Sequence, residues 1–378
     1  MPHYDHYVRY NDSIETRQED EEALIEKIVA SMGRVNRSHF DKYRHGIRDA
    51  HAKSHAVITG TLTVYEGLAV HLRQGVFAEP RSYPIVVRFS SAPGDFQSDG
   101  RPALRGMAIK MLGVEGPQVL PGHRGEKTQD WLLVNHPVIP FGHVAAYWKA
   151  QQFSEKQSQS SELSHAVTSK LIHGAAKALQ HVGAQNETLK ALAPPNHHLL
   201  GETFHSMAAL RFGDHIAKLS ATPLSESVRK LTGQPIDADS PPSILRDLAV
   251  AFFEQQGAEY ELRAQLCTDL GKMPVEDASI EWPEHLSPHQ PIAKLTFPPQ
   301  EAYSPARRVY ADDVLSFNPW HCIEAHRPLG SIMRVRRQAY ESSSRFRHEM
   351  NAQPRMEPKD ITDVPGGVSA DPSRKIEP

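Results

Sequence analysis

The stretch AEYELRAQLCTD, residues 258–269, shows the clearest alternation of apolar and polar side chains in this chain. Apolar side chains stand at every second residue from Tyr260 to Leu266, and charged or amide side chains stand between them. Successive side chains of a β-strand point to opposite faces of a sheet, so this spacing predicts a strand with one buried and one exposed face.

Further strand-like segments lie on both sides of this one in the sequence. They are residues 55–65, 83–90, 105–112, 131–135, the region near 203–220, and 291–297. In YPIVVRFS (83–90), Arg88 and Ser90 share one face of the expected strand. Strands come first, helices are interposed, and strands and a last helix follow, which indicates an α+β protein built around one antiparallel sheet or barrel.

Apolar residues at helical spacing predict several helices. In the first, Leu24, Ile25, Ile28 and Val29 share a face, and Gly33 is a plausible residue to follow its end. The others are expected at 162–183, 243–257 and 331–350. The resulting division is an N-terminal arm and helix (1–40), a barrel domain (41–350) with helical insertions at about 145–200 and 241–257, and a flexible C-terminal tail (351–378).

Composition excludes several classes of protein. The chain of 378 residues has 42 Lys+Arg against 45 Asp+Glu, and this balance argues against nucleic acid as the main partner. Two cysteines cannot form a disulfide framework. No apolar run approaches the ~20 residues of a membrane span, and the N-terminus is too polar for a signal peptide. A soluble cytoplasmic protein without a membrane span is therefore predicted.

Common catalytic motifs are missing from the sequence. It contains no GxxxxGK[ST], no GxGxxG after a strand, no HExxH and no GxSxG. The pair His197-His198 follows Ala-Pro-Pro and has no third ligand at a useful spacing, which favours a solvated loop over a metal site. The basic run of the last helix, from Arg334 to His348, has no basic excess elsewhere to support nucleic-acid binding.

The last helix places an arginine and a tyrosine on one face. Arg336 and Tyr340 are four residues apart, and Arg347 follows seven residues later, about 10 Å along the helix. One interpretation is a core tyrosine with a cation stacked on its ring. The other is an iron ligand, because a free phenol titrates near ~10 and a nearby guanidinium favours the phenolate form. The helix alone does not decide between these interpretations.

Five segments together resemble the haem-site motifs of the monofunctional haem catalases. They are IRDAHAK (47–53), VVRFSSAPGD (86–95), RPALRGMAIK (101–110), DWLLVNHP (130–137) and RVRRQAY (334–340). Each motif is weak alone, but all five occur in the family's order over about residues 40 to 347. The resemblance implies an antiparallel β-barrel of the haem-catalase type with flanking helices and a proximal helix that carries the haem ligand.

The resemblance also implies roles for single residues on the two sides of a haem. Tyr340 would be the axial ligand of the iron, and Arg336 would be its charge partner. On the opposite side His51 would move protons, Asn135 would be the amide that holds peroxide, and Ser90 would orient His51. His55 is a rival for the role of His51, and Asn135 would alternatively cap a turn.

Three arginines would neutralise the two haem propionates by the same resemblance. These are Arg48, Arg88 and Arg347. Buried carboxylates are costly unless they are paired, which explains why several arginines would converge there. Arg48 and Arg88 would otherwise be ordinary ion-pair partners.

The chain also departs from the catalase pattern. Tyr340 is followed by Glu-Ser-Ser-Ser instead of Pro-Asp-Thr-His, and Asn135 stands in Asn-His-Pro instead of Asn-Thr-Pro. Phe141 is the one candidate for a distal aromatic residue. The sequence ends soon after the proximal helix, so the wrapping segment and the C-terminal domain of catalases are expected to be missing. The resemblance is closer to the short catalase-related bacterial proteins and to the allene oxide synthases built on the same core.

These features predict a haem-dependent peroxidase or catalase-like oxidoreductase. It would cleave hydrogen peroxide or organic hydroperoxides through a high-valent oxo-iron intermediate, with haem b as cofactor and a small reductant as second substrate. A wider approach to the iron predicts strong peroxidatic and weak-to-moderate catalatic activity. A homo-oligomer, dimer or tetramer, is expected.

Two alternative functions stay open at this point. One is a fatty-acid hydroperoxide isomerase or lyase like the allene oxide synthases. In those of the coral type a Thr precedes the distal His, whereas Ala50 precedes His51 here, which favours the peroxidase. The other is a non-catalytic haem or lipid carrier, which would need neither His51 nor Asn135.

Overall fold

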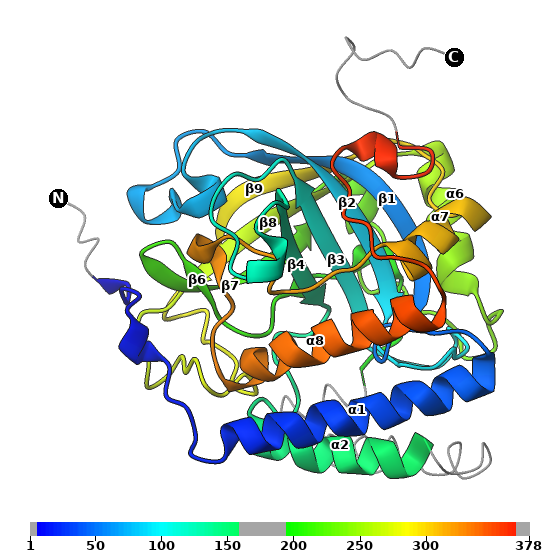
Figure 1. Ribbon diagram of the computed structural model, residues 1–378. Helices are drawn as coiled ribbons and strands as arrows, with labels where there is room; N and C mark the ends of the chain where they lie inside the picture. The colour runs from blue at the N-terminus through cyan, green and yellow to red at the C-terminus, as the bar shows by residue number, and fades with distance from the viewer. Residues whose placement is uncertain (1–5, 159–193, 368–378) are drawn as a thin grey trace, which may run out of the picture.

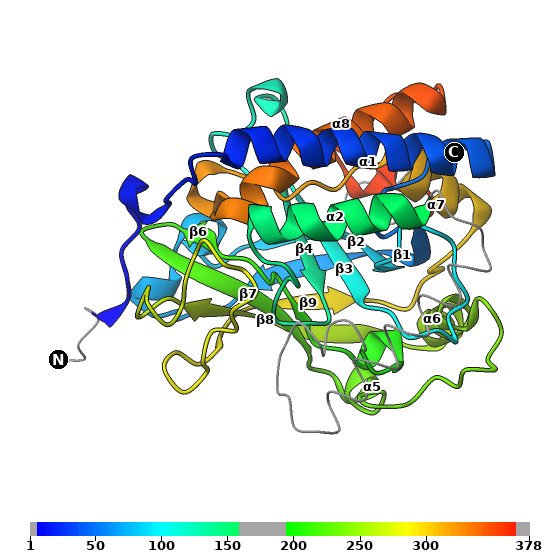
Figure 2. The ribbon, with the colours of Figure 1, turned by 90° about the horizontal axis from the view of Figure 1, so that it is seen from below.

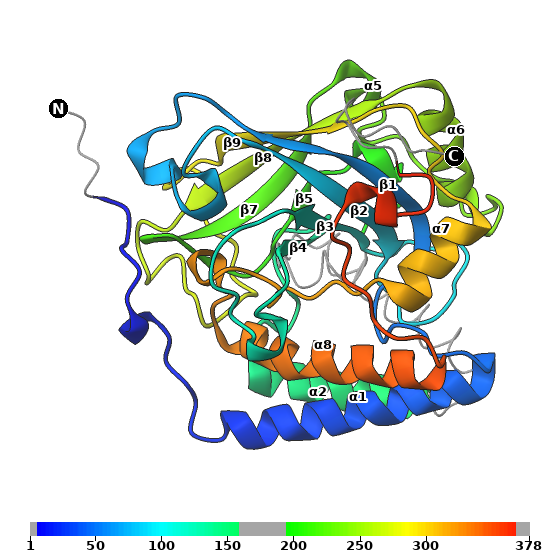
Figure 3. The same ribbon diagram turned by 45° about the horizontal axis from the view of Figure 1, so that its top comes forward.

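The strands of the computed structural model form one closed antiparallel barrel (Figures 1 and 3). The structure describes residues 6–158 and 194–367. The strands in these residues are β1 (Lys53–Val64), β2 (Ser82–Ser91), β3 (Arg105–Leu112), β4 (Thr128–Val134), β5 (Phe204–His205), β6 (Leu210–Phe212), β7 (His215–Pro223), β8 (Ala258–Leu266) and β9 (Gln290–Phe297). Their order is β5-β4-β3-β2-β1-β9-β8-β7-β6, and a pairing of β5 with β7 closes a ring of eight strands. The predicted α+β fold with an antiparallel barrel is confirmed.

The interior of the barrel contains the main hydrophobic core. On β8 the predicted inward residues Tyr260, Leu262, Ala264 and Leu266 are all fully buried. Polar and apolar residues alternate on this strand because one face meets the core and the other faces outward. The strand-like segments predicted from the sequence all correspond to strands of this barrel.

Three long helices pack side by side across one side of the barrel (Figures 1 and 2). The helices of the described residues are α1 (Glu21–Tyr43), α2 (Val144–Ser158), α5 (Glu226–Arg229), α6 (Ile244–Gln255), α7 (Pro305–Val309) and α8 (Ser331–Met350). The layer consists of α1, α2 and α8, and a second core that includes Ile28, Val144 and Ile332 joins them. Short 3₁₀ turns occur at Asp12–Ile14, Val70–Leu72, Gly75–Phe77, Pro121–His123, Leu199–Gly201, Glu324–His326 and Ile361–Asp363, and a π-helical turn, η7, at Tyr310–Val314.

The observed helices confirm some predicted boundaries and correct one. Helix α8 spans the predicted 331–350, and α6 lies within the predicted 243–257. Helix α1 does not end at Gly33 but continues to Tyr43, because Val35 on the next turn is buried. Arg44 ends the helix in a left-handed conformation (φ 52°). The helix predicted at 162–183 lies outside the described residues.

Residues 351–367 pack against the barrel, whereas the sequence predicts a flexible tail there (Figure 1). Ile361 and Val364 are buried, and Glu357 forms an ion pair with the buried Lys110. Lys110 also donates to Asp130 at 2.7 Å. A buried cation is costly unless it is paired, so this contact fixes the segment. The composition of residues 351–367 could not predict this contact, because Lys110 is distant in sequence.

Two neutral histidines, the buried His326 and the half-buried His205, are expected to make the stability of the fold sensitive to acid. Burial lowers the pKa of His205 and of His326 to about 3. His326 accepts the N–H of Val76 at 3.0 Å and lies against aromatic rings. Below pH 6.5 the unfolded chain takes up protons that these folded histidines do not bind. The free energy of unfolding should therefore fall as the pH decreases from about 6.5 to 3, by up to about 1.4 kcal/mol per pH unit for each such histidine.

Urea unfolding at pH 7, 6 and 5 measures this dependence. A His326→Gln variant keeps a hydrogen-bond acceptor but no titrating group, so its stability should depend less steeply on pH. An unchanged pH dependence in this variant would contradict the role given to His326.

Candidate functional site

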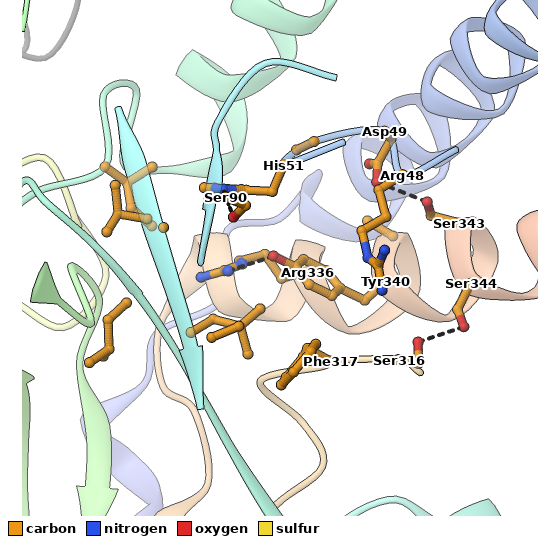
Figure 4. Close-up of a pocket in the computed structure, with 18 of the residues that line it drawn as sticks. Arg48, Asp49, His51, Ser90, Ser316, Phe317, Arg336, Tyr340, Ser343 and Ser344 are labelled. Carbon is orange, nitrogen blue, oxygen red and sulfur yellow. Dashed lines mark hydrogen bonds between the residues drawn. The ribbon is translucent and has the colours of Figure 1, made fainter. Parts of the chain in front are cut away.

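A cavity lies between α8 and the barrel (Figure 4). Its lining comes from β2, β3 and β4, from α8, and from residues 48–51 between α1 and β1. The empty volume is about 1140 Å³ with the mouth counted. Ser343 of α8 donates to Asp49 at 2.8 Å and so ties the 48–51 segment to the helix. Segments almost 300 residues apart in sequence thus enclose one space.

His51 enters the cavity from the segment before β1 (Figure 4). It has a left-handed backbone (φ 56°), held by its N–H, which donates to the carbonyl of Ala92 at 2.9 Å. Its Nδ1 lies 3.0 Å from Oγ of Ser90. A Cβ at Gly106 would lie 2.6 Å from the imidazole, so the ring packs where only glycine leaves room. Backbone, serine and glycine together fix its orientation.

The environment of His51 keeps its imidazole neutral. Burial, and then the guanidiniums of Arg88, Arg336 and Arg48, lower its pKa to about 3. The neutral form is the one that accepts a proton. His51 can therefore act as a base at neutral pH.

Tyr340 and Arg336 lie on one face of α8, as their spacing predicts. Nη2 of Arg336 donates to the phenol oxygen of Tyr340 at 2.7 Å, and the guanidinium carbon lies 5.0 Å from the ring centroid. Tyr340 and His51 both point into the cavity, from α8 and from the segment before β1 (Figure 4).

Three guanidiniums gather around the π-helical turn η7. Arg48 donates to the carbonyls of Ala311 and Leu315 at 2.6 and 2.8 Å, and Arg347 donates to the carbonyls of Asp312 and Leu315. The Asp312 carboxylate pairs with Arg48 at 3.3 Å and with Arg88 at 3.2 Å. The structure thus brings together the three arginines predicted to bind carboxylates.

The ion pairs of this cluster leave one guanidinium without a carboxylate partner. Asp312 pairs with Arg48 and Arg88, whereas Arg347 has no carboxylate in ion-pair contact among the described residues; the charges of Asp313 and Asp49 act on it from farther away. Nε of Arg88 is buried and has no hydrogen-bond partner there. Burial and the neighbouring arginines hold the pKa of Arg48 well below its usual value, and burial lowers that of Arg347 to about 10. The cluster is therefore suited to bind further anionic groups.

Asp312 and the apolar part of the lining were missed by sequence reasoning. Asp312 belongs to a polar doublet that no motif singles out, and only the fold brings it to the arginines. Apolar side chains from several elements complete the lining: Met32, Met107, Leu133, Ile139, Met207 and Phe317. Their positions in separate segments give no pattern that a sequence could reveal.

Other predicted residues lie outside the cavity lining. Asn135 accepts the N–H of Arg105 at 2.6 Å through its side-chain oxygen and does not line the cavity. Phe141 is 37% exposed and is absent from the lining, so the structure does not place it as a distal aromatic residue. His55 is fully buried, and its Nε2 lies 2.7 Å from Oγ of Ser91.

The remaining candidates for metal or nucleic acid have structural contacts. His198 caps a 3₁₀ turn by accepting the N–H of Leu200, and His197 lies 3.4 Å from Glu202. Arg334, in the basic run, is bound by the carboxylates of Glu15, Glu21 and Glu276. His198 is buried, so the solvated loop predicted for this pair is wrong for His198, whose ring is used for capping; the ion pairs of Arg334 agree with a structural role for that residue.

A cluster of potential metal ligands that the sequence did not suggest contains His123, Glu126 and His321. Arg355 donates to the carboxylate of Glu126 and approaches both histidine rings. This guanidinium already supplies a positive charge to the cluster, so we assign no metal there.

Comparisons with known proteins identify the fold. No protein-family model and no curated protein matches the sequence. Among solved structures, the chain resembles a fungal catalase with a TM-score of 0.57 and 16% identity over 90% of this chain and 70% of that one. It also resembles catalase A from Saccharomyces cerevisiae with a TM-score of 0.53 and 16% identity over 89% of this chain and 71% of that one. No helix of the described residues is long and apolar enough to cross a membrane. The protein therefore has the catalase fold.

Proposed function

We propose that this protein binds haem between His51 and Tyr340 and uses it to cleave hydrogen peroxide or organic hydroperoxides. The observation that carries the proposal is the pairing of a neutral imidazole with an arginine-bound phenol in one cavity. Their elements come from opposite ends of the chain. A merely structural role would not require both groups to face the same space.

The charges of the site fit a haem. Arg48 and Arg88 share the single carboxylate of Asp312, and Arg347 has no carboxylate in ion-pair contact among the described residues, so guanidinium donors remain for the two carboxylates of the porphyrin edge. The unpaired Nε of Arg88 is one donor available to them. Tyr340 would hold the iron, as tyrosine does in catalase, and Arg336 would stabilise its phenolate. The apolar lining suits the porphyrin faces.

Bound haem would supply the electrons that break the O–O bond. The residues of the chain would move the proton of the peroxide. His51 would take a proton from the bound peroxide at Nε2 and return it to the leaving oxygen, while Ser90 holds Nδ1 and the ring orientation. Asn135 accepts from Arg105 through its side-chain oxygen and lies outside the lining, so its amide N–H would have to reach the cavity to hold the peroxide, and this role stays a prediction.

The apolar lining favours the binding of organic hydroperoxides in addition to hydrogen peroxide. Met107, Leu133, Ile139 and Met207 give the cavity an apolar wall that can contact an alkyl chain. The same wall supports a second candidate, an isomerase or lyase for fatty-acid hydroperoxides. The predicted homo-oligomer and cytoplasmic location stay predictions.

Two measurements test the proposed function. Purified protein loaded with haem should show a Soret band that changes on mixing with peroxide, and absence of haem binding would reject the proposal. Product analysis with a lipid hydroperoxide and a dye donor would then separate the candidates. Oxidised dye with a lipid alcohol indicates a peroxidase, whereas a rearranged lipid without dye oxidation indicates the isomerase.

Asp312→Asn should bind haem more tightly, although the variant without haem should be less stable. Asp312 competes with the haem carboxylates for Arg48 and Arg88, but it also neutralises them when haem is absent. The expected changes are at least about tenfold in haem affinity and about 1–3 kcal/mol in the free energy of unfolding without haem. Haem titration and urea unfolding measure the two effects.

Asp313→Asn is the matched control. Asp313 is the next residue and carries the same charge, but its ion pair is with His45, and its charge acts on Arg48 and Arg347 only from farther away. Weaker haem binding by the Asp312 variant than by this control would show that Asp312 helps to hold the cofactor.

A further inference from the structure

A second cavity adjoins the first at Arg48. Arg48 lines both cavities, whereas its ion-pair partner Asp312 lines only the second. Arg48 therefore stands between the two cavities, where it pairs with Asp312 at 3.3 Å and donates to the carbonyls of Ala311 and Leu315. The second cavity has an empty volume of about 1040 Å³ with its mouth counted.

Aromatic and apolar side chains at the second cavity are exposed. Phe96 is 42% and Val309 is 54% exposed, and both belong to the few large apolar side chains exposed among the described residues. Tyr43 packs edge-on against Phe96 with 5.2 Å between ring centroids. Isolated exposed apolar residues are ordinary, but an aromatic pair and an aliphatic side chain around one hollow mark a place for an apolar ligand.

The charges of the second cavity are balanced. Arg48 and Arg308 stand against Asp312 and Asp313, so the lining favours a neutral ligand. Oδ1 of Asp313 accepts from His45 and Asn351, and its Oδ2 has no hydrogen-bond partner among the described residues. That oxygen is available to accept a hydroxyl proton. A ligand whose aromatic ring contacts Tyr43 and Phe96 and whose hydroxyl donates to Asp313 would be a small phenol.

We propose that the second cavity binds a phenolic reductant, which supplies the electrons for peroxide cleavage; this proposal rests on the proposed function. The overall reaction is ROOH + 2 ArOH → ROH + H₂O + 2 ArO•. Each phenol would lose one electron to the haem of the proposed function and one proton, first to the Asp313 carboxylate. The two electrons and two protons reduce the peroxide to an alcohol and water.

Hydroquinone is the probe, and the variants are Phe96→Ala and Val309→Ser. Loss of apolar contact should lower kcat/KM for hydroquinone about tenfold in each. The rate of the Soret change with peroxide alone should stay at the wild-type value, because neither residue lines the first cavity. Val70→Ser is the matched control, since Val70 is 61% exposed and does not line the second cavity.

A second measurement needs no haem. Line broadening in the NMR spectrum of hydroquinone should report binding to the haem-free wild-type chain and to the Val70 control, and it should weaken with Phe96→Ala. Unchanged broadening in Phe96→Ala, or equal kcat/KM in all variants, would overturn the reductant site. If peroxide changes no spectrum even in the wild type, the proposed function fails and the donor role with it, and the NMR result still shows whether the cavity takes a phenol.

Discussion

Tyr340→Phe is expected to lose most of its haem while it keeps its fold. Among the described residues of the cavity lining, Tyr340 supplies the phenol oxygen that is bonded to a guanidinium, at 2.7 Å from Arg336. Even outer partners of metal ligands are worth about 10–100-fold in metal affinity, so loss of the ligand itself should weaken haem binding at least about 100-fold. Haem titration followed at the Soret band measures this, and circular dichroism checks the fold.

Tyr147→Phe is the control for this variant. Tyr147 of α2 lines the same cavity, and burial raises its pKa to about 12, so its phenol stays neutral. It should therefore keep wild-type haem affinity when its hydroxyl is removed. Normal haem affinity in Tyr340→Phe, or equal losses in both variants, would refute Tyr340 as the iron ligand.

Local patterns were sufficient to predict an antiparallel sheet or barrel and the last helix, and the resemblance then implied the barrel. On β8 the polarity of each side chain indicates which face of the sheet it lies on, because the side chains of a strand alternate between the two faces with a period of two residues. On α8 the spacing of Arg336 and Tyr340 determines that they share a face. Both inferences depend on neighbours in sequence, and both agree with the structure.

Features that depend on long-range contacts could not be predicted in this way. The left-handed backbone of His51 depends on a hydrogen bond to the carbonyl of Ala92, and the space for its imidazole depends on the absence of a side chain at Gly106. Asp312 reaches the arginines through a π-helical turn, which no periodicity of the sequence indicates. The resemblance located His51 because its motif preserves the residue, but the residue pattern alone did not explain how the side chain is held.

Asn135 shows the limit of transferring a role from a motif. Its position follows β4, where the resemblance expects it, yet its side-chain oxygen binds the backbone of Arg105. The motif fixes the place of the residue along the chain. The direction of its side chain depends on a neighbouring strand, so the amide role needs its own test.

His51→Ala should keep haem but react with peroxide about 10²–10⁴-fold more slowly, the usual contribution of a positioned general base. His51 is the histidine that lines the cavity among the described residues, and its bond to Ser90 aims the free nitrogen at the space. Stopped-flow measurement of the Soret change against peroxide concentration gives the rate constant. Haem content measured beforehand separates a lost proton transfer from a lost cofactor.

His55→Gln decides between the two histidines of the motif. His55 is fully buried, faces Ser91 and lies outside the cavity lining, so its replacement should lower stability but leave the peroxide rate within about threefold. If His51→Ala reacts at the wild-type rate and His55→Gln does not, the proton would have to move through His55. The ring at residue 55 would then need a path to the iron that its bond to Ser91 now closes, and the position of haem inferred from Tyr340 and the arginines would have to be revised.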